Sequence, residues 1–143
     1  GHKKIKQAVK PIKVATGEMC QNRILFKQFI QQDAVDIVQI DSCRIGGLNE
    51  VLGVLLLAHK YQKPVWPHAG GVGLCEYVQH ISMIDYLLIS CEKNSKRIEY
   101  VDHLHEHFIN PCKINDGKYM APLEPGFSIE MKPETFTNFL HLK

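Results

Sequence analysis

Short β-prone runs alternate with helical stretches as far as residue 101, and this alternation constrains the fold more than any other feature of the chain. The β-prone runs lie at 12–18, 35–40, 63–68 and 97–101. The first three runs are each followed by a stretch in which apolar residues recur at helical spacing, at 19–34, 48–61 and 74–88. Strands joined by helices over short connections pair in parallel with right-handed crossovers. The chain is therefore predicted to be an α/β protein, built either on an open doubly wound sheet or on part of a (β/α)8 barrel.

The pattern changes near residue 111, where the alternation of strands and helices ends. Asn115-Asp-Gly-Lys118 is a turn signal between two short β-prone pairs and predicts a hairpin. A last short helix is expected from Pro133, because proline is favoured in the first helical turn and Glu134 complements the helix dipole there. We therefore expect residues 1–110 to form the α/β part, and residues 111–143 to form a hairpin, an irregular tail and a short helix.

The composition is that of a globular domain, with 45% hydrophobic and 22% charged residues among 143. The net charge of +2 comes from interspersed charges without a basic run. The electrostatic footprint of a nucleic-acid-binding protein is therefore missing, and no nucleic-acid partner is predicted. The longest apolar run, Val54 to Ala58, is too short to span a bilayer, so no membrane partner is predicted either.

The cysteines and the N-terminus bear on the cellular compartment. The chain has 5 cysteines, widely spaced and without a C-x-x-C pair, which argues against a disulfide framework and a zinc knuckle. A reducing compartment fits this pattern best. The chain begins Gly1-His-Lys-Lys4, with neither an initiator methionine nor the architecture of a signal peptide, so we expect it to be the interior of a longer polypeptide.

Four ionisable residues fall at or near the predicted strand ends: Glu18, Asp41, His68 and Glu99. In barrel enzymes the catalytic groups project from the carboxyl ends of the strands, so these four side chains are expected to converge on one rim. Such a set suits proton abstraction beside a carboxylate, in which acidic ligands hold a divalent metal and a histidine moves protons. An aspartate beside the histidine would fix the imidazole tautomer and raise its basicity. Taken singly, each residue also has an ordinary structural use, as a helix-entry carboxylate, a loop cap, a packed imidazole or an outward strand residue.

Longer segments around these residues resemble the enolase superfamily, and within it most closely the L-fuconate dehydratases, including the mitochondrial members of animals. The resemblance runs through essentially the whole chain. The matching segments are Val14-Ala-Thr-Gly-Glu18, Gln39-Ile-Asp-Ser-Cys-Arg-Ile-Gly-Gly47, Pro67-His-Ala-Gly-Gly-Val-Gly-Leu-Cys-Glu76, Ile98-Glu99, Asp102-His-Leu-His105 and Pro125-Gly-Phe127. The fold implied by the resemblance is the C-terminal half of a (β/α)8 TIM barrel, strands five to eight of the family, followed by a segment that packs toward a capping domain.

The resemblance also implies roles for individual residues. Glu18 corresponds to one of three metal-binding carboxylates, Asp41 and His68 to a catalytic dyad, and Glu99 to a carboxylate beside the substrate. The implied reaction is the Mg2+-dependent dehydration of a sugar acid, L-fuconate to 2-keto-3-deoxy-L-fuconate. A base removes the C2 proton, the metal stabilises the enediolate, and the histidine helps to expel the C3 hydroxyl. The implied location is the mitochondrion, with the cytosol as the alternative.

The chain departs from the complete family pattern. The other two metal carboxylates, a Lys-x-Lys pair and the capping domain all lie outside it. Lys4-Ile-Lys6 has the spelling of the lysine pair, but it precedes Glu18 in a predicted helix and is interpreted as a solvated helix face. We expect the isolated chain to be inactive, because a single carboxylate binds Mg2+ weakly. The alternative hypothesis is a non-catalytic binding or oligomerisation module. Unpaired strand edges in half a barrel favour a homo-oligomer, for example two copies that close one barrel.

Several polar residues have two open interpretations. Arg44 is a candidate donor to the sugar acid or a partner in a surface salt bridge. The alternating His103, His105 and His107 would chelate a transition metal if the segment were extended, although a structural use is favoured. The glycines at 70–73 are interpreted as a loop that shapes the substrate pocket rather than as a phosphate loop, because no Walker lysine is present. Cys43 and Cys75 are interpreted as packing residues.

Overall fold

Three parallel backbone segments form the central sheet of the computed structural model, which describes residues 1–94 and 96–139. Strand β1 (Ala15–Thr16) pairs in parallel with β2 (Ile37–Val38), with Ala15 opposite Ile37. A parallel bridge between Val38 and Val65 adds the third segment. The ladder continues to the rim, where the His68 N–H donates to the Ile40 carbonyl at 3.0 Å. The predicted parallel pairing of the first three strands is therefore confirmed, although each regular ladder is shorter than the predicted run.

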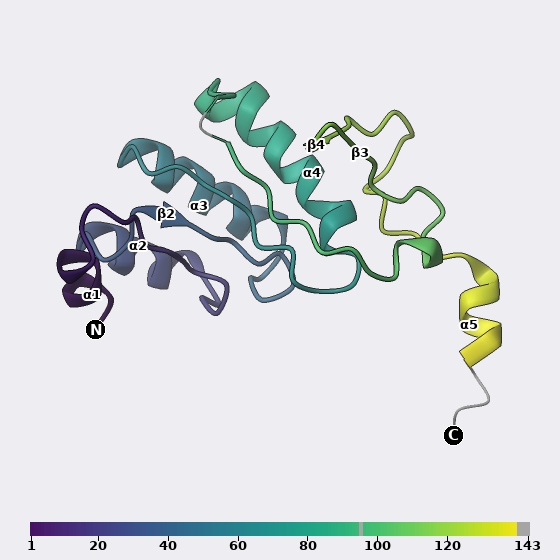
Figure 1. The fold of residues 1–143 in the computed structure, drawn as a ribbon, viewed down its shortest axis with the longest axis horizontal. Coiled ribbons are helices and arrows are strands. Elements are labelled where there is room, and N and C mark those ends of the chain that lie inside the picture. Colours follow the sequence, from purple (N-terminus) through teal and green to yellow (C-terminus); the bar gives the residue numbers. More distant parts are fainter. Residues whose placement is uncertain (95, 140–143) are drawn as a thin grey trace.

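Helices follow the strands in chain order, and Figure 1 shows α2, α3 and α4 succeeding one another across the molecule. Their bounds are α2 (Arg23–Gln31), α3 (Leu48–Lys60) and α4 (Leu74–Ile84). Helix α2 begins later than predicted because the Asn22 side chain caps it, accepting hydrogen bonds from the N–H groups of Ile24 and Leu25. It ends before Asp33, whose positive φ of 50° breaks the helix. Within the described residues, no helix is long and apolar enough to cross a membrane.

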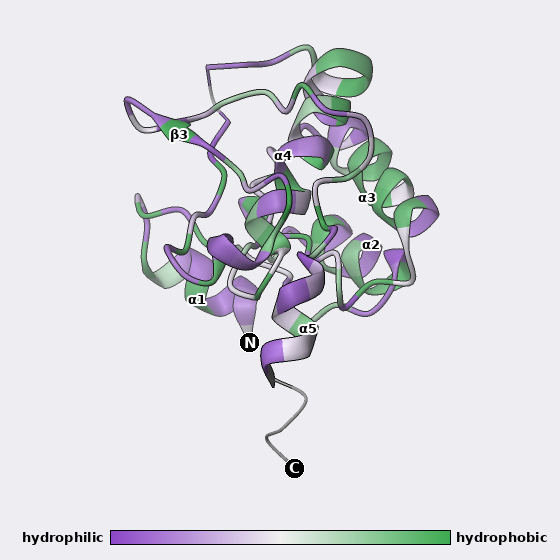
Figure 2. Ribbon diagram, turned by 90° about the vertical axis from the view of Figure 1, so that its right-hand side faces the viewer, coloured by the Kyte–Doolittle hydropathy of each residue, from purple (hydrophilic) through white to green (hydrophobic). Residues whose placement is uncertain are grey.

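The main hydrophobic core lies between the sheet and the first helices. Helix α3 supplies much of it and is coloured hydrophobic over most of its length in Figure 2. The most deeply buried members are Phe26, Val35, Val38, Ile40, Val51, Val54, Leu55, Ala58 and Ile81. A second, smaller cluster packs around Ala69, Leu74, Cys75 and Val78. The two clusters hold the strand ends at 40–41 and 68–69 against the helices.

The helix predicted to run to Leu88 changes its geometry at Ile84. A π-helical turn, η1 (Asp85–Ser90), continues α4 and carries Leu88 to 77% exposure. Asp85, the first residue of this turn, is buried and pairs with Lys96. Residues 85–88 are therefore helical as predicted, but with π rather than α geometry, and Leu88 does not lie on the apolar face that the sequence predicted.

The fourth predicted strand, at 97–101, is also wrong in the described structure, where these residues join no backbone ladder. The segment is instead held by other contacts. The Glu99 carboxylate accepts a hydrogen bond from the Ala69 N–H, and the Val101 N–H donates to the Cys75 sulfur at 3.4 Å. Apolar contacts of Ile98 and Val101 with the second cluster complete the attachment. The segment is therefore attached through side-chain contacts rather than through the predicted strand pairing.

The C-terminal part follows the prediction closely. Strands β3 (Ile114–Asn115) and β4 (Lys118–Tyr119) pair antiparallel. Both residues of the turn, Asp116 and Gly117, have positive φ, as a two-residue Asp-Gly hairpin turn requires. A short 3-10 helix, η2 (His105–His107), precedes the hairpin, and α5 (Pro133–Phe139) begins at the predicted proline.

Helix α1 (His2–Ala8) carries Lys4 and Lys6, and the interpretation of both as a solvated helix face is wrong for Lys6. Lys4 is exposed, but Lys6 is buried and its ammonium group lies 2.6 Å from Asp33 and 3.0 Å from Asp36. Lys6 therefore anchors α1 to the loop between α2 and β2 and does not lie on a solvated face. The sequence pattern missed this because the partner carboxylates are about thirty residues away along the chain.

Candidate active site

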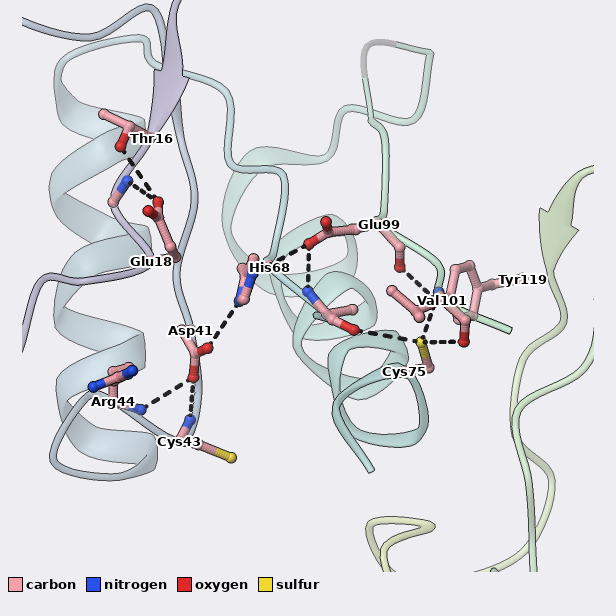
Figure 3. A network of polar contacts seen from close by, with 12 residues as sticks. Thr16, Glu18, Asp41, Cys43, Arg44, His68, Cys75, Glu99, Val101 and Tyr119 are labelled. Carbon is pink, nitrogen blue, oxygen red and sulfur yellow. Dashed lines mark hydrogen bonds and ion pairs between the residues drawn. The ribbon is translucent and has the colours of Figure 1, made fainter. Parts of the chain in front are cut away.

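Backbone pairing brings the predicted residues to one rim. Glu18, Asp41 and His68 each follow one of the three parallel segments, and Figure 3 shows them in a row with Glu99. Gly17 allows the first of these placements. Its φ is +140°, and a Cβ atom there would lie 2.6 Å from the Gln39 carbonyl oxygen. Only glycine lets the chain pass this close to the neighbouring segment and turn Glu18 onto the rim.

Asp41 and His68 form the dyad that the sequence predicted. The His68 Nδ1 atom lies 2.8 Å from Oδ2 of Asp41. The other oxygen, Oδ1, accepts main-chain hydrogen bonds from Cys43 at 2.7 Å and Arg44 at 3.1 Å. Because a carboxylate only accepts, Nδ1 carries the proton, and Nε2 of the neutral ring presents a lone pair. The buried aspartate thus fixes both the orientation and the tautomer of the imidazole.

The Nε2 edge of the imidazole is directed toward Glu99. The His68 Nε2 atom lies 3.7 Å from Oε2 of Glu99, beyond a hydrogen bond, while the same oxygen accepts from the Ala69 N–H at 2.7 Å. Gly70 keeps this edge of the ring accessible, because a Cβ atom at residue 70 would lie 2.8 Å from Nε2. Nε2 is therefore positioned to exchange a proton with a bound molecule rather than with a neighbouring side chain.

Glu18 is held as a carboxylate. Hydrogen bonds from its own main chain, from the Gly17 N–H and from the Thr16 hydroxyl lower the pKa of Glu18 and outweigh the opposing effect of burial. An ionised carboxylate on the rim has the donor chemistry of a ligand for Mg2+. In the part of the chain that the structure describes, however, Glu18 is not joined by two further ligating side chains. The residues present supply one carboxylate to such a site and do not complete it.

The other sequence candidates have different outcomes. Arg44 is exposed, and none of the ion pairs in the described ranges involves its guanidinium group, so the salt-bridge interpretation gains no support. Cys43 is exposed, so its interpretation as a packing residue is wrong. Cys75 is buried in the second cluster, as predicted, and a hydrogen bond from the Cys112 thiol lowers the pKa of Cys75.

The three alternating histidines do not converge. His103 is exposed, His105 contacts Glu76, and His107 lies 3.1 Å from the Thr135 hydroxyl. The proposed chelate of three histidines is therefore not formed. The structural use that the sequence favoured is seen for His105 and His107, which tie η2 to α4 and to α5.

Sequence reasoning missed the groups that support the site from behind. The Tyr119 hydroxyl donates to the Glu99 carbonyl at 2.6 Å, and Cys75 contacts the carbonyl groups of Ala69 and Val101 (Figure 3). These contacts join the hairpin and α4 to the segment that carries Glu99. No local signal marks them, because main-chain atoms have no sequence signature and Tyr119 is 20 residues from its partner.

Comparison with known proteins identifies the family of this chain and several of its relatives. A family described as "Enolase C-terminal domain-like" matches residues 1–135. L-galactonate dehydratase of Hypocrea jecorina is 58% identical over 141 residues, which cover 97% of this chain and 31% of that protein. The crystal structure of human mitochondrial enolase superfamily member 1 matches with a TM-score of 0.90 and 53% identity, over 94% of this chain and 31% of that one.

A more distant structure extends the comparison. L-talarate/galactarate dehydratase from Salmonella typhimurium LT2, liganded with Mg and L-lyxarohydroxamate, matches with a TM-score of 0.74 and 25% identity, over 93% of this chain and 31% of that one. The chain therefore spans 31% of the length of each of these relatives.

Proposed function

Because this chain belongs to the enolase C-terminal domain-like family, we propose that the polypeptide containing it dehydrates a sugar acid to the 2-keto-3-deoxy acid. The observation that carries the proposal is the Asp41–His68 pair with an accessible Nε2 atom facing Glu99. Dehydration of a sugar acid needs a side chain that transfers protons close to the carbon atoms next to the substrate carboxylate, and His68 supplies such a side chain.

Each residue of the rim is given one role in this proposal. His68 exchanges the proton at Nε2, acting as the acid that protonates the departing C3 hydroxyl. Asp41 keeps the proton on Nδ1 and stabilises the imidazolium whenever the ring is doubly protonated. Glu99, held by the Ala69 N–H, accepts or shares a hydrogen bond with the substrate on the open side of the ring. Arg44 is proposed to reach the sugar acid as a bidentate donor.

Glu18 is proposed to be one of the ligands of Mg2+, together with two carboxylates outside this chain. When bound, Mg2+ supplies positive charge that favours removal of the proton beside the substrate carboxylate. The contribution of Glu18 is its ionised state, which its hydrogen bonds maintain. A relative liganded with Mg supports this assignment.

The substrate is proposed to be a six-carbon acid of the L-galacto configuration. L-fuconate, which the sequence resemblance implied, is L-galactonate without the C6 hydroxyl, so both acids present the same groups at C2 and C3. The 58% identity to an L-galactonate dehydratase supports this configuration. The enzyme would then distinguish L-galactonate from L-fuconate by the group at C6. A site built to hydrogen-bond the C6 hydroxyl would reject L-fuconate strongly, whereas an apolar site would discriminate weakly.

Turnover of both acids with Mg2+ tests the proposal, with the 2-keto-3-deoxy product detected for this chain and for a longer polypeptide that contains it. His68→Gln should lower kcat in the longer polypeptide by about 10²- to 10⁴-fold, since it removes the proton-transfer group. His59→Gln is the matched control, because His59 is an exposed histidine on α3. Equal rates for the two variants would refute the role of His68. Activity of the isolated chain would refute the need for groups outside it.

The polypeptide is proposed to act in mitochondria. The support is the 53% identity to a human protein named as a mitochondrial member of the superfamily. Fractionation of cells that express the longer polypeptide, followed by an immunoblot with mitochondrial and cytosolic markers, tests this location. Recovery with the cytosolic marker alone would refute it.

A further inference from the structure

A second group of chemically active side chains lies away from the Asp41–His68 dyad. Glu76 of α4, His105 of η2 and Cys112, just before β3, come together from three parts of the chain. Their ligand atoms, one oxygen, one nitrogen and one sulfur, all lie within 4.8 Å of one another. The proposed dehydration uses none of the three.

The imidazole of His105 is oriented as a metal-binding histidine would be. Its Nε2 atom lies 2.8 Å from the Val101 carbonyl, which can only accept, so Nε2 carries a proton. The Nδ1 atom of the neutral ring is then a bare lone pair, and it faces Glu76 Oε1 at 2.5 Å and Cys112 Sγ at 3.8 Å. A backbone carbonyl behind the ring is the usual way in which a ligating histidine is held. A cation, either a proton or a metal ion, must separate this lone pair from the carboxylate.

The carboxylate itself points to a missing partner. Glu76 is fully buried, yet its Oε2 atom has no hydrogen-bond partner among the described residues. An unpaired carboxylate oxygen inside a protein carries a large desolvation cost unless a cation offsets it. Oε1 is better satisfied, because it accepts from the Cys112 N–H at 3.3 Å and faces His105. The orphaned oxygen is therefore an independent indication that the cluster takes a ligand.

We propose that Glu76, His105 and Cys112 bind a divalent transition-metal ion, with Zn2+ as the ion that best suits one carboxylate, one imidazole and one thiolate. In a tetrahedral zinc site, neighbouring ligand atoms are about 3.3 to 3.6 Å apart. The sulfur-to-nitrogen distance of 3.8 Å is close to this spacing, whereas the 2.5 Å nitrogen-to-oxygen distance must open by somewhat less than 1 Å. The thiol loses its proton on binding, and that proton is released to solvent. Two negative ligands then neutralise the charge of the ion.

The position of the cluster defines its effect. The ion would join α4 to the segments that flank Glu99, and Tyr119 of the following hairpin donates to the Glu99 carbonyl. A metal at this place stabilises the attachment of the C-terminal segment and, through it, the position of Glu99. The role is structural, since all three ligands lie outside the rim of the dyad.

Titration of the reduced chain with Co2+ tests the site directly, because a thiolate ligand gives cobalt a near-ultraviolet charge-transfer band that carboxylate and imidazole ligands alone do not give. We expect the band to saturate at one equivalent of cobalt and Zn2+ to abolish it by displacement. Cys112→Ser and His105→Gln should each weaken Co2+ binding at least about tenfold. The matched controls are Cys91→Ser and His103→Gln, which change exposed residues of the same types and should bind like the unmodified chain.

Absence of a saturable band would overturn the proposal, as would equal affinities for the Cys112→Ser, His105→Gln and control variants. A measurement on the unmodified chain avoids reliance on variants that fail to fold. One equivalent of Zn2+ should slow alkylation of Cys112 by iodoacetamide, read by peptide mass spectrometry, and leave Cys91 unchanged. Equal rates at Cys112 with and without Zn2+ would show that the cluster is only an ion pair between Glu76 and His105. Neither readout depends on dehydratase activity.

Discussion

Gly70→Ala is the substitution that most directly tests how the dyad is kept accessible. Gly70 does not have a positive φ, so alanine fits the backbone there without strain. The effect of the substitution is therefore confined to the added methyl group. That methyl group would lie 2.8 Å from Nε2 and 3.0 Å from Cε1 of His68. Because ordinary contact begins near 3.4 Å, the ring must retreat by about 0.6 Å.

The retreat has a predictable cost. The imidazole cannot turn freely, since Nδ1 is held by Asp41 at 2.8 Å and Asp41 by two main-chain N–H groups. Displacing a reacting group by about 1 Å costs up to about 10²-fold in rate, so we expect kcat to fall about 10- to 100-fold, or about 1.4 to 2.7 kcal/mol of transition-state stabilisation. The assay is sugar-acid turnover by the longer polypeptide.

Gly71→Ala is the control, because its added methyl group would contact Leu74 at 3.1 Å and not His68. Nitrogen NMR of the imidazole gives a readout that is independent of activity: the Nδ1–H signal of His68 should shift in Gly70→Ala and stay unchanged in Gly71→Ala. Unchanged turnover together with an unchanged Nδ1–H signal in Gly70→Ala would refute the steric reasoning.

Two further predictions concern the scaffold. Gly17→Ala should lower the free energy of unfolding by about 2 to 5 kcal/mol, and Gly47→Ala by about 1 to 3 kcal/mol. Both glycines have positive φ, but of the two only Gly17 has atoms close enough to clash with an added methyl group. Equal losses of stability in urea denaturation would contradict this reasoning. The Lys6 and Lys63 ammonium groups lower the pKa of Asp33 to about 2. The ion pairs of Asp33 with the two lysines therefore stabilise the fold above pH 4, and this stabilisation is lost as the pH falls through 2. Lys6→Met should raise this pKa more than Lys63→Met does in a carboxyl NMR titration, and the opposite order would show that Lys6 is not the main partner.

The α/β class and the rim were predictable because they depend on local pattern. β-prone runs and helical spacing of apolar residues indicate where strands and helices form, and parallel pairing then brings successive strand ends to one edge. The dyad followed from this rule before any distance was known. The expectation of half a (β/α)8 barrel, which came from the resemblance, is confirmed by the family match and by the TM-score of 0.90.

Distant contacts that do not follow from parallel strand pairing were not predictable. Residues 97–101 read as a strand by composition, but a ladder needs a partner backbone, and side-chain contacts to Ala69 and Cys75 hold the segment instead. Lys6 read as solvated because its partners, Asp33 and Asp36, lie in another loop. Burial of a charge depends on what packs over it, which periodicity does not encode.

The sequence by itself determined which residues could do chemistry and at which end of the strands they would lie, because β-prone runs and the parallel pairing that they imply are properties of the chain. Only the tertiary structure decided which atom of His68 is free, which oxygen of Glu76 is left unpaired, and that Cys112 meets His105. The reason is physical: a tautomer, an orphaned acceptor and a ligand cluster are set by distances between atoms that the fold brings together from separate parts of the chain.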